Sequence, residues 1–302
     1  MIKIDPDWLR SHPLPESQTP TDKNERGRVL VIGGSTFVPG ALRLTGEAAL
    51  RAGAGKLQMG TVGEVALNLG LIVPEAGLLA LPSDGAGELD VQGVDAVIEQ
   101  ACACDALVLG PGMRGSASCT EFVGRIVAAL PPSVAVVLDA AAIAAARGCR
   151  DAIRSHVGPM ILTPHHGEMA ALTGTSKEHI SRHGEQVARE VAEDLNAIIV
   201  LKAAETLIAS PKADCLIHDG GTPGLATGGS GDVLAGILGG LLSRRAEPMA
   251  AAGWAVWTHG QAGSQLTERL GGPGLLGREL IDLIPEILNS ASRRGLAGVR
   301  KS

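Results

Sequence analysis

Aromatic side chains are scarce in this 302-residue chain: they make up 2 % of it, and tyrosine is absent. Proteins that bind single-stranded nucleic acid stack the bases on aromatic rings, so the composition argues against that class. The formal net charge of -6 also provides no basic surface for nucleic acid or for an anionic membrane. We therefore expect no nucleic-acid partner, and any anionic ligand must be held by local features of the fold.

Signals for metal binding, secretion and membrane insertion are missing as well. The five cysteines have no paired metal-ligand spacing, and the amino terminus has no apolar signal core, which together predict reduced thiols. No apolar run reaches the roughly 20 residues of a membrane span. The phosphate-binding pattern G-x-x-x-x-G-K-[ST] does not occur, which disfavours ATPases of that type. We expect a cytoplasmic protein with no membrane partner.

Short apolar runs alternate with longer segments that have helical spacing and charged faces. This alternation predicts an α/β fold in which helices cover both faces of a mostly parallel sheet. Residues 206–220 predict an antiparallel hairpin, and the chain from about 231 onward predicts helices only. We expect residues 1–26 to be a polar N-terminal extension and 27–302 to form a single domain. The predicted strands lie within 28–34, 56–62, 76–82, 105–112, 134–140, 160–165 and 197–203.

The segment ATGGSGD at 226–232 precedes an apolar pattern of helical spacing, so a helix should begin near Ser230 or Gly231. The unpaired N–H groups and the positive dipole end of its first turn would hold a phosphate or a developing anion. Asp232 would then be placed to take a proton from a substrate hydroxyl. The alternative is that Asp232 only complements the helix dipole. The glycines inside the helix favour close contact with another element, because glycine otherwise weakens a helix.

Other polar residues follow predicted strands and should meet at the carboxyl edge of the sheet. They include His165 and Glu168 in LTPHHGEMAALTG, and Lys202 with Thr206 after the next strand. Each of these, taken alone, is an ordinary loop or strand residue. The segment GPGMRG at 110–115, followed by Asp139, also mimics the fingerprint of a dinucleotide-binding Rossmann enzyme, although its proline would stiffen the turn.

Taken together and in order, these motifs resemble the ADP-dependent NAD(P)H-hydrate dehydratases of the ribokinase-like superfamily. The resemblance rests on VLVIGGS, PGALRLTGEAALRAGAG, LGPGM, VVLDA, LTPHHGEMAALTG, GLATGGSGDVLAGI and GRELIDLIPEIL, which span roughly residues 25 to 290. It implies a three-layer α/β/α fold and the repair of hydrated NADH or NADPH. The family removes water from the damaged nicotinamide ring at the expense of ADP or ATP.

The resemblance also implies roles for individual residues. Asp232 would deprotonate the substrate hydroxyl, and Gly229 and Gly231 would stabilise the transferring phosphoryl group. Glu168 matches an acid that positions Mg²⁺ through water in related kinases. The hydrated dinucleotide would contact Ala41, Gly112, His165 and Asp232. The adenine nucleotide would contact Lys202, Ala203, Ala204, Glu205, Thr206 and Gly231, and ADP would leave as AMP.

Three positions depart from the family pattern. Ala203 stands where glycine is usual, Ala141 where a second acid is usual, and His166 where proline is usual. We expect weaker ADP binding, an altered metal or substrate contact, and a looser loop, respectively. Two alternatives follow: a small-molecule kinase of the hydroxyethylthiazole type, and a catalytically weak nucleotide sensor. The resemblance further implies a homo-oligomer, and a separate epimerase in the same pathway, because 1–26 is too short for that domain.

Overall fold

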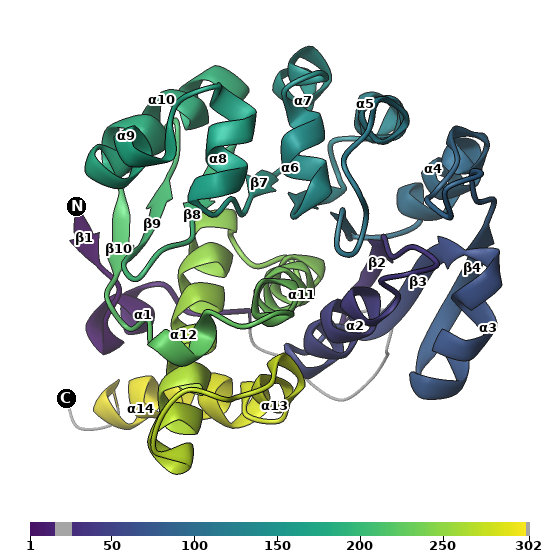
Figure 1. Cartoon of the computed structure of the whole chain (residues 1–302). Coiled ribbons are helices and arrows are strands. Elements are labelled where there is room, and N and C mark those ends of the chain that lie inside the picture. The colour runs from purple at the N-terminus through teal and green to yellow at the C-terminus, as the bar shows by residue number, and fades with distance from the viewer. Residues whose placement is uncertain (16–25, 300–302) are drawn as a thin grey trace.

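The computed structural model describes residues 1–15 and 26–299, with side chains placed up to residue 291. Its centre is one 10-stranded sheet with the order β1-β10-β9-β8-β7-β6-β5-β2-β3-β4. Neighbouring strands are parallel except for the pairs β8–β9 and β9–β10. The predicted mostly parallel sheet and the antiparallel hairpin are therefore both confirmed, and helices lie on both sides of the sheet (Figure 1).

Strands β2, β5, β6, β7 and β8 coincide with the apolar runs of the sequence, because they are buried along most or all of their length. Strand β1 is exposed, and β4 is only partly buried. The hairpin joins β9 to β10 in antiparallel register, with Ile217 opposite Leu207. The strand bounds are β1 Ile2–Lys3, β2 Arg28–Ile32, β3 Lys56–Val62, β4 Ala76–Leu81, β5 Ala106–Leu109, β6 Ala135–Leu138, β7 Met160–Leu162, β8 Ile198–Leu201, β9 Thr206–Ala209 and β10 Leu216–His218.

The helices form two layers, each over its own apolar core (Figure 1). One layer contains α1 Pro6–Ser11, α2 Gly40–Arg51, α3 Gly63–Ile72, α11 Ser230–Ser243, α12 Pro248–Leu270, α13 Gly277–Ile281 and α14 Ile284–Val299. The other contains α4 Val94–Cys102, α5 Ala117–Ala129, α6 Ala141–Ala146, α7 Arg150–Ser155, α8 His166–Thr173, α9 Lys177–Arg182 and α10 Gly184–Leu195. Two short 3₁₀ turns, η1 Val91–Gly93 and η2 Pro223–Leu225, complete the chain.

Residues along a strand alternate between the two cores, as the pleat requires. In β2, Val29 and Val31 belong to the core under α2 and α11, whereas Leu30 and Ile32 belong to the opposite core. All four side chains are fully buried. The sheet is therefore the middle layer of three, and no face of β2 is left for water.

Helices α2 and α11 cross in close contact. A Cβ atom built on Gly236 would lie 2.3 Å from the carbonyl oxygen of Thr45, and one on Gly240 would lie 2.5 Å from that of Ala49. A Cβ on Gly239, on the sheet side, would lie 2.3 Å from Val108 Cγ2. The glycines inside α11 are thus explained by the approach of a helix backbone and of the sheet, as the sequence predicted.

The first eleven residues differ from the expected polar extension. Strand β1 pairs in parallel with β10 and ends the sheet, and α1 follows it directly. Ile4, Trp8 and Leu9 are buried in the core under α12 and α14. The sequence did not predict β1 and α1, because so few residues are too short a stretch to show a clear strand or helix periodicity. Residues 16–25 of the expected extension lie outside the described residues.

The chain order reverses between β5 and β2, so the crevice at their carboxyl ends is the usual ligand site of such a sheet. Helix α11 packs on β5 and β6, beside this point of reversal. Within the ranges described, no helix has the length and apolar character that crossing a bilayer demands.

Candidate functional site

Helix α11 begins at Ser230, as predicted, and its first turn lacks a capping side chain. Gly229 occupies the N-cap position with φ of 87° and no side-chain hydrogen bond caps the helix. A φ in this left-handed region favours glycine. The N–H groups of the first turn therefore have no side-chain acceptor, which leaves them available for an anion.

Asp232 lies in this first turn beside a buried group of charges. Its carboxylate is close to Gly229, since a Cβ built there would lie 3.9 Å from Asp232 Oδ2. Burial raises the pKa of Asp232 to about 6, and the negative charge of Asp139 adds to this, while Lys202 opposes it. A carboxyl group with a pKa near 6 is well matched to general-base chemistry near neutral pH.

Lys202 is the centre of the charge group. Its Nζ lies 2.9 Å from Asp139 Oδ1 and 3.7 Å from Glu168 Oε2. Burial disfavours the ammonium form, but the attraction of Asp139 and Glu168 outweighs it, so the pKa of Lys202 is raised and the side chain stays charged. A Cβ built on Gly231 would lie 3.3 Å from Lys202 Nζ, which places this cation beside the first turn of α11.

Asp139 anchors Lys202 from the end of β6. It is 2 % exposed and accepts a hydrogen bond of 2.5 Å from the Thr163 hydroxyl at the end of β7. Because Asp139 is bound to Lys202 and Thr163, it is not free to contact a ribose as the Rossmann fingerprint would require. The chain after Gly110 also begins no helix until Ala117, which removes the helix N-terminus that this alternative needs.

His165 and Glu168 form a capping box at the start of α8. His165 Nδ1 accepts hydrogen bonds from the backbone N–H of Gly167 and Glu168, and Glu168 Oε2 accepts one from the N–H of His165. Burial raises the pKa of Glu168, although Lys202 opposes the shift. His166 is the first residue of this helix, and the looser loop expected from it remains a prediction.

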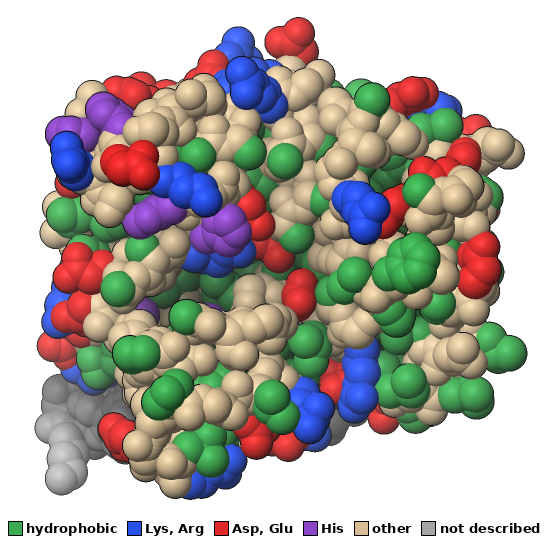
Figure 2. All heavy atoms as spheres, in the orientation of Figure 1, with side chains coloured by type: hydrophobic (Ala, Val, Ile, Leu, Met, Phe, Trp, Pro, Cys, Tyr) green, Lys and Arg blue, Asp and Glu red, His purple; other side chains and the backbone are tan. Residues whose placement is uncertain are grey.

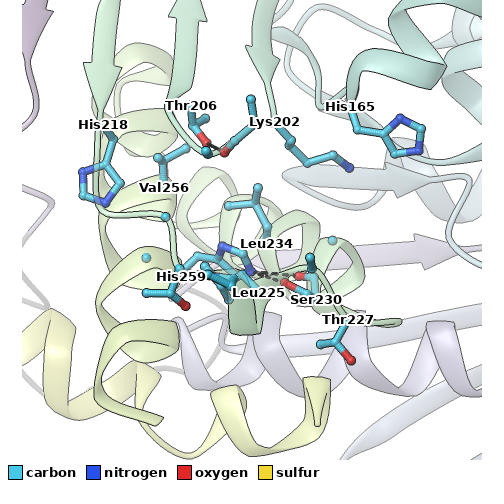
Figure 3. Close-up of a pocket in the computed structure, with 18 residues that line it drawn as sticks. His165, Lys202, Thr206, His218, Leu225, Thr227, Ser230, Leu234, Val256 and His259 are labelled. Carbon is cyan, nitrogen blue, oxygen red and sulfur yellow. Dashed lines mark hydrogen bonds between the residues drawn. The ribbon is translucent and has the colours of Figure 1, made fainter. Parts of the chain in front are cut away.

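A cavity of about 660 Å³ opens between α11, α12, η2 and the ends of β8 and β9. Figure 2 shows a hollow in this face bordered by histidine and basic side chains, and Figure 3 shows the labelled lining residues from both sides of the cavity. The lining consists of His165, Lys202, Ala203, Ala204, Thr206, His218, Gly221, Thr222, Pro223, Leu225, Ala226, Thr227, Ser230, Gly231, Leu234, Val256, His259 and Gly260.

The structure brings most of the predicted nucleotide residues to this cavity. Lys202, Ala203, Ala204, Thr206 and Gly231 line it, whereas Glu205 is exposed and is absent from its lining. Ala203 has no positive φ, so the methyl group in place of the family's glycine causes no backbone strain. Ala141 begins α6, directly after Asp139 and Ala140.

Two predicted dinucleotide residues lie elsewhere in the crevice. Ala41 is buried at the start of α2, and a Cβ built on Gly112 would lie 3.0 Å from Ala41 Cβ. Neither residue lines the cavity. Both lie over the neighbouring region, where β2 pairs with β5. Gly229 connects the two areas, since a Cβ there would lie 2.5 Å from Leu44 of α2. The first turn of α11 thus lies between two areas of one crevice.

Sequence reasoning missed two parts of the site. One is the contact between Ser230 and His259, which lie 29 positions apart on two different helices, so no local sequence motif marks it. The other is the segment from Thr222 to Thr227, which lines the cavity from η2 and reads only as a turn. The only signal for the second part is the run of Gly220, Gly221, Thr222 and Gly224 before ATGGSGD.

Comparison with known proteins agrees with this geometry. A family model described as NAD(P)H-hydrate dehydratase matches residues 29–286. The ADP-dependent (S)-NAD(P)H-hydrate dehydratase of Xanthomonas campestris pv. campestris is 42% identical over 287 residues, covering 94% of this chain and 95% of that protein. The Bifunctional NAD(P)H-hydrate repair enzyme Nnr of Moorella thermoacetica is 34% identical, and the match covers 94% of this chain but 53% of that longer protein.

A solved structure extends the comparison to three dimensions. The ADP/ATP-dependent NAD(P)H-hydrate dehydratase from Bacillus subtilis, co-crystallized with ATP/Mg2+, aligns with a TM-score of 0.80 and 30% sequence identity. The alignment covers 96% of this chain and 98% of that chain. The family model, the near full-length relative and this fold agree with one another. The chain belongs to the NAD(P)H-hydrate dehydratase family, with the ribokinase-like fold.

Proposed function

We propose that this chain is an ADP-dependent (S)-NAD(P)H-hydrate dehydratase, which restores NADH or NADPH from the hydrated cofactor and releases phosphate and AMP. The observation that carries the proposal is Asp232, with its pKa raised to about 6, at the uncapped N-terminus of α11. Lys202 lies beside the same turn and a cavity opens next to it. A base, an anion site and a cation are thus grouped within one crevice.

Asp232 would take the proton from the ring hydroxyl while the hydroxyl oxygen attacks the terminal phosphorus of the nucleotide. The bond from that phosphorus to the bridging oxygen then breaks, and AMP leaves when the donor is ADP. First-turn N–H groups at Gly231 and the ammonium of Lys202 would stabilise the charge on the transferring group. The bond from the ring carbon to the phosphate oxygen then breaks, and phosphate leaves with its electron pair. The neighbouring carbon loses a proton to water, and the electron pair of that C–H bond restores the double bond.

The two areas of the crevice fit two ligands. The cavity lined by Lys202, Ala203, Ala204 and Thr206 would hold the adenine nucleotide. The area around Ala41 and Gly112 would hold the hydrated dinucleotide. His165, which lines the cavity, would contact the dinucleotide from that side. Asp232 lies at the turn that separates the two areas. A base must lie there if it deprotonates the dinucleotide while the adenine nucleotide donates its phosphoryl group.

Glu168 is the residue we propose to position Mg²⁺ beside the nucleotide phosphates. Mg²⁺ usually keeps several waters and takes one or two carboxylates together with phosphate oxygens. Glu168 fits such an outer position, because one of its oxygens already accepts the His165 N–H. Among residues 1–15 and 26–291, whose side chains are placed, no group of three metal-binding side chains is assembled. When bound, the ion would neutralise phosphate charge.

Further parts of the proposal concern partners. The longer bifunctional relatives, of which this chain spans about half, motivate the proposal that a separate epimerase supplies the (S)-hydrate. We also propose a homo-oligomer acting in the cytoplasm. Sedimentation of the purified protein tests the first of these properties, and fractionation of the source cells tests the second.

The decisive experiment supplies hydrated NADPH and Mg²⁺ to the purified protein, with ADP and ATP in parallel reactions. Reduced-nicotinamide absorbance should return with one phosphate released for each cofactor repaired. A stable phosphoester in place of released phosphate would instead establish the kinase alternative. Nucleotide binding without either product would establish the sensor alternative, which the substitutions Ala203 and Ala141 motivate.

A further inference from the structure

The start of α11 is held by a histidine that the proposed reaction does not yet use. His259, on α12, places its Nε2 2.8 Å from the Ser230 hydroxyl and 3.0 Å from the Ser230 carbonyl oxygen. Both residues line the cavity, and the dashed lines in Figure 3 mark this pair of contacts. Ser230 is 3 % exposed, so its hydroxyl has little access to water outside the cavity.

The carbonyl contact determines which ring nitrogen carries the proton. A carbonyl oxygen only accepts hydrogen bonds, so the 3.0 Å contact requires a proton on Nε2. That proton is shared between the carbonyl and the hydroxyl oxygen of Ser230. Burial also lowers the pKa of His259 to about 4, with Lys202 and His218 adding to the effect, so the ring is neutral and carries a single proton at pH 7.

The assignment leaves the Ser230 hydroxyl with a defined direction of donation. Its oxygen accepts from His259, so its own proton must go to another acceptor. Among residues 1–15 and 26–291, whose side chains the structure places, the Ser230 hydroxyl has no such acceptor. Ser230 is the first residue of α11 and lies beside Gly231 and Thr227 in the cavity wall.

We propose that His259 is a positioning residue which, by donating from Nε2, fixes the Ser230 hydroxyl as a hydrogen-bond donor to a phosphate oxygen of the adenine nucleotide. The inference rests on the proposed function, since it assigns a donor to the phosphate that function requires. The opposite tautomer would use up the Ser230 proton on the ring and would turn a lone pair toward the Ser230 carbonyl. The histidine therefore selects the state of the serine that can bind phosphate.

The test is a double-mutant cycle on nucleotide affinity, measured by calorimetry with ADP and with ATP. Ser230→Ala should weaken binding about tenfold or more, as expected for a lost hydrogen bond to a charged group. His259→Leu should weaken binding by a similar factor in the wild-type background, and by less than about twofold in the Ser230→Ala background. His259→Gln, whose amide N–H can replace Nε2–H, should recover most of the affinity.

Two controls separate positioning from packing. Thr258→Val, on the same helix, removes a buried hydroxyl that has no hydrogen-bond partner among the described residues, and should leave nucleotide affinity unchanged. Adenosine, which lacks phosphate, should bind the wild type and Ser230→Ala with equal affinity. A role of His259 in packing alone would instead lower the midpoint of unfolding and weaken both ligands together.

The outcomes distinguish the inference from the proposed function. Additive losses in the cycle, or equal losses for ADP and adenosine, would overturn the positioning role while leaving the dehydratase proposal intact. Failure of the wild-type protein to bind either ADP or ATP would overturn both. Coupled losses confined to phosphate-bearing ligands would establish the role of His259, even if turnover of hydrated NADPH were absent.

Discussion

At the scale of single residues, the two buried carboxylates of the site differ in their contacts. Asp139 is held in place by Lys202 and by the hydroxyl of Thr163. Among the residues whose side chains are described, Asp232 makes no such hydrogen bond or ion pair, and burial raises its pKa to about 6. A buried acid with a shifted pKa beside a cavity is a common mark of an acid–base group in an active site. Asp232 is therefore the acid free to move a proton.

The first prediction concerns the pH dependence of turnover. If Asp232 is the base, kcat/KM should rise tenfold per pH unit below about 6 and level off above it, because only the carboxylate accepts the proton. Asp232→Asn should lower kcat by roughly 10²–10⁴ and abolish this limb. Steady-state rates between pH 5 and 8 provide the measurement. An Asn variant that kept full activity would remove Asp232 from the mechanism.

The same residue makes a second prediction, on stability. The pKa of Asp232 is higher in the folded than in the unfolded chain, so the folded state binds more protons between the two values. The contribution of Asp232 to stability therefore falls as pH rises from about 4 to 6. In urea titrations, the free energy of unfolding of Asp232→Asn minus that of the wild type should be larger at pH 8 than at pH 4.5. An unchanged difference between the two pH values would contradict the raised pKa.

A third prediction concerns the buried ion pair. Asp139→Ala would leave the Lys202 ammonium without its nearest counterion, and should lower the free energy of unfolding by roughly 3 kcal/mol. Asp139→Asn, which retains an acceptor for Thr163, should cost less. The surface pair of Lys3 and Asp219, at 2.7 Å with both side chains more than half exposed, is the control, and Asp219→Ala should have little effect. Equal losses at the two sites would show that burial does not strengthen the Asp139 pair.

At the scale of elements, the packing of α11 on α2 determines where the anion site lies. The two helices approach so closely that Gly236 and Gly240 face backbone carbonyls of α2. The first turn of α11 is thereby fixed above the carboxyl edge of the sheet, next to Leu44. The sequence predicted this contact from the cost of glycine in a helix, but it had no means to name α2 as the partner, because glycine leaves no complementary pattern on the other helix.

The fourth prediction tests that crossing. Gly236→Ala places a Cβ 2.3 Å from the Thr45 carbonyl oxygen, which only movement of a helix backbone can relieve, and should cost about 1–3 kcal/mol. Gly40→Ala, at the start of α2, is the matched control: apart from its chain neighbours and its own helix backbone, no described atom lies within 4 Å of the added Cβ. It should change stability by less than about 0.5 kcal/mol. Urea unfolding of both variants gives the comparison. A Gly236→Ala variant as stable as the control would mean that the helices are not in contact there.

At the scale of the whole molecule, the sequence predicted the layers and which strand ends meet at one edge, but not how the sheet ends. Apolar runs predicted β2 to β8, and the pattern at 206–220 predicted the hairpin of β9 and β10. The signal is strong where a strand is buried on both faces, as in β2, β5 and β6. Lys202 and Gly231 reached one cavity as expected, since strand ends and a helix start meet at one edge. The contact of Ser230 with His259 and the docking of Trp8 depend on tertiary packing between distant elements, which local spacing does not encode.

Trp8 connects the amino-terminal segment to the helix that carries His259. Its ring lies against α12, where a Cβ on Gly253 would come within 2.3 Å of it, and it stacks on His12 at 4.3 Å. The indole N–H of Trp254, also on α12, donates to the His12 carbonyl at 2.7 Å. Residues 1–12 are therefore packed against α12 as well as paired with β10, and we expect them to unfold together with the rest of the domain.

The fifth prediction follows from that coupling. Trp8→Ala removes a side chain that is 7 % exposed and should lower the free energy of unfolding by about 3–5 kcal/mol. Ile2→Ala, at a position 43 % exposed, should have a much smaller effect. If the segment is part of one cooperative unit, the urea midpoint falls while the slope m is unchanged, since the same surface is exposed on unfolding. A segment that detached on its own would instead lower m, and the midpoint of the remaining domain would stay close to that of the wild type.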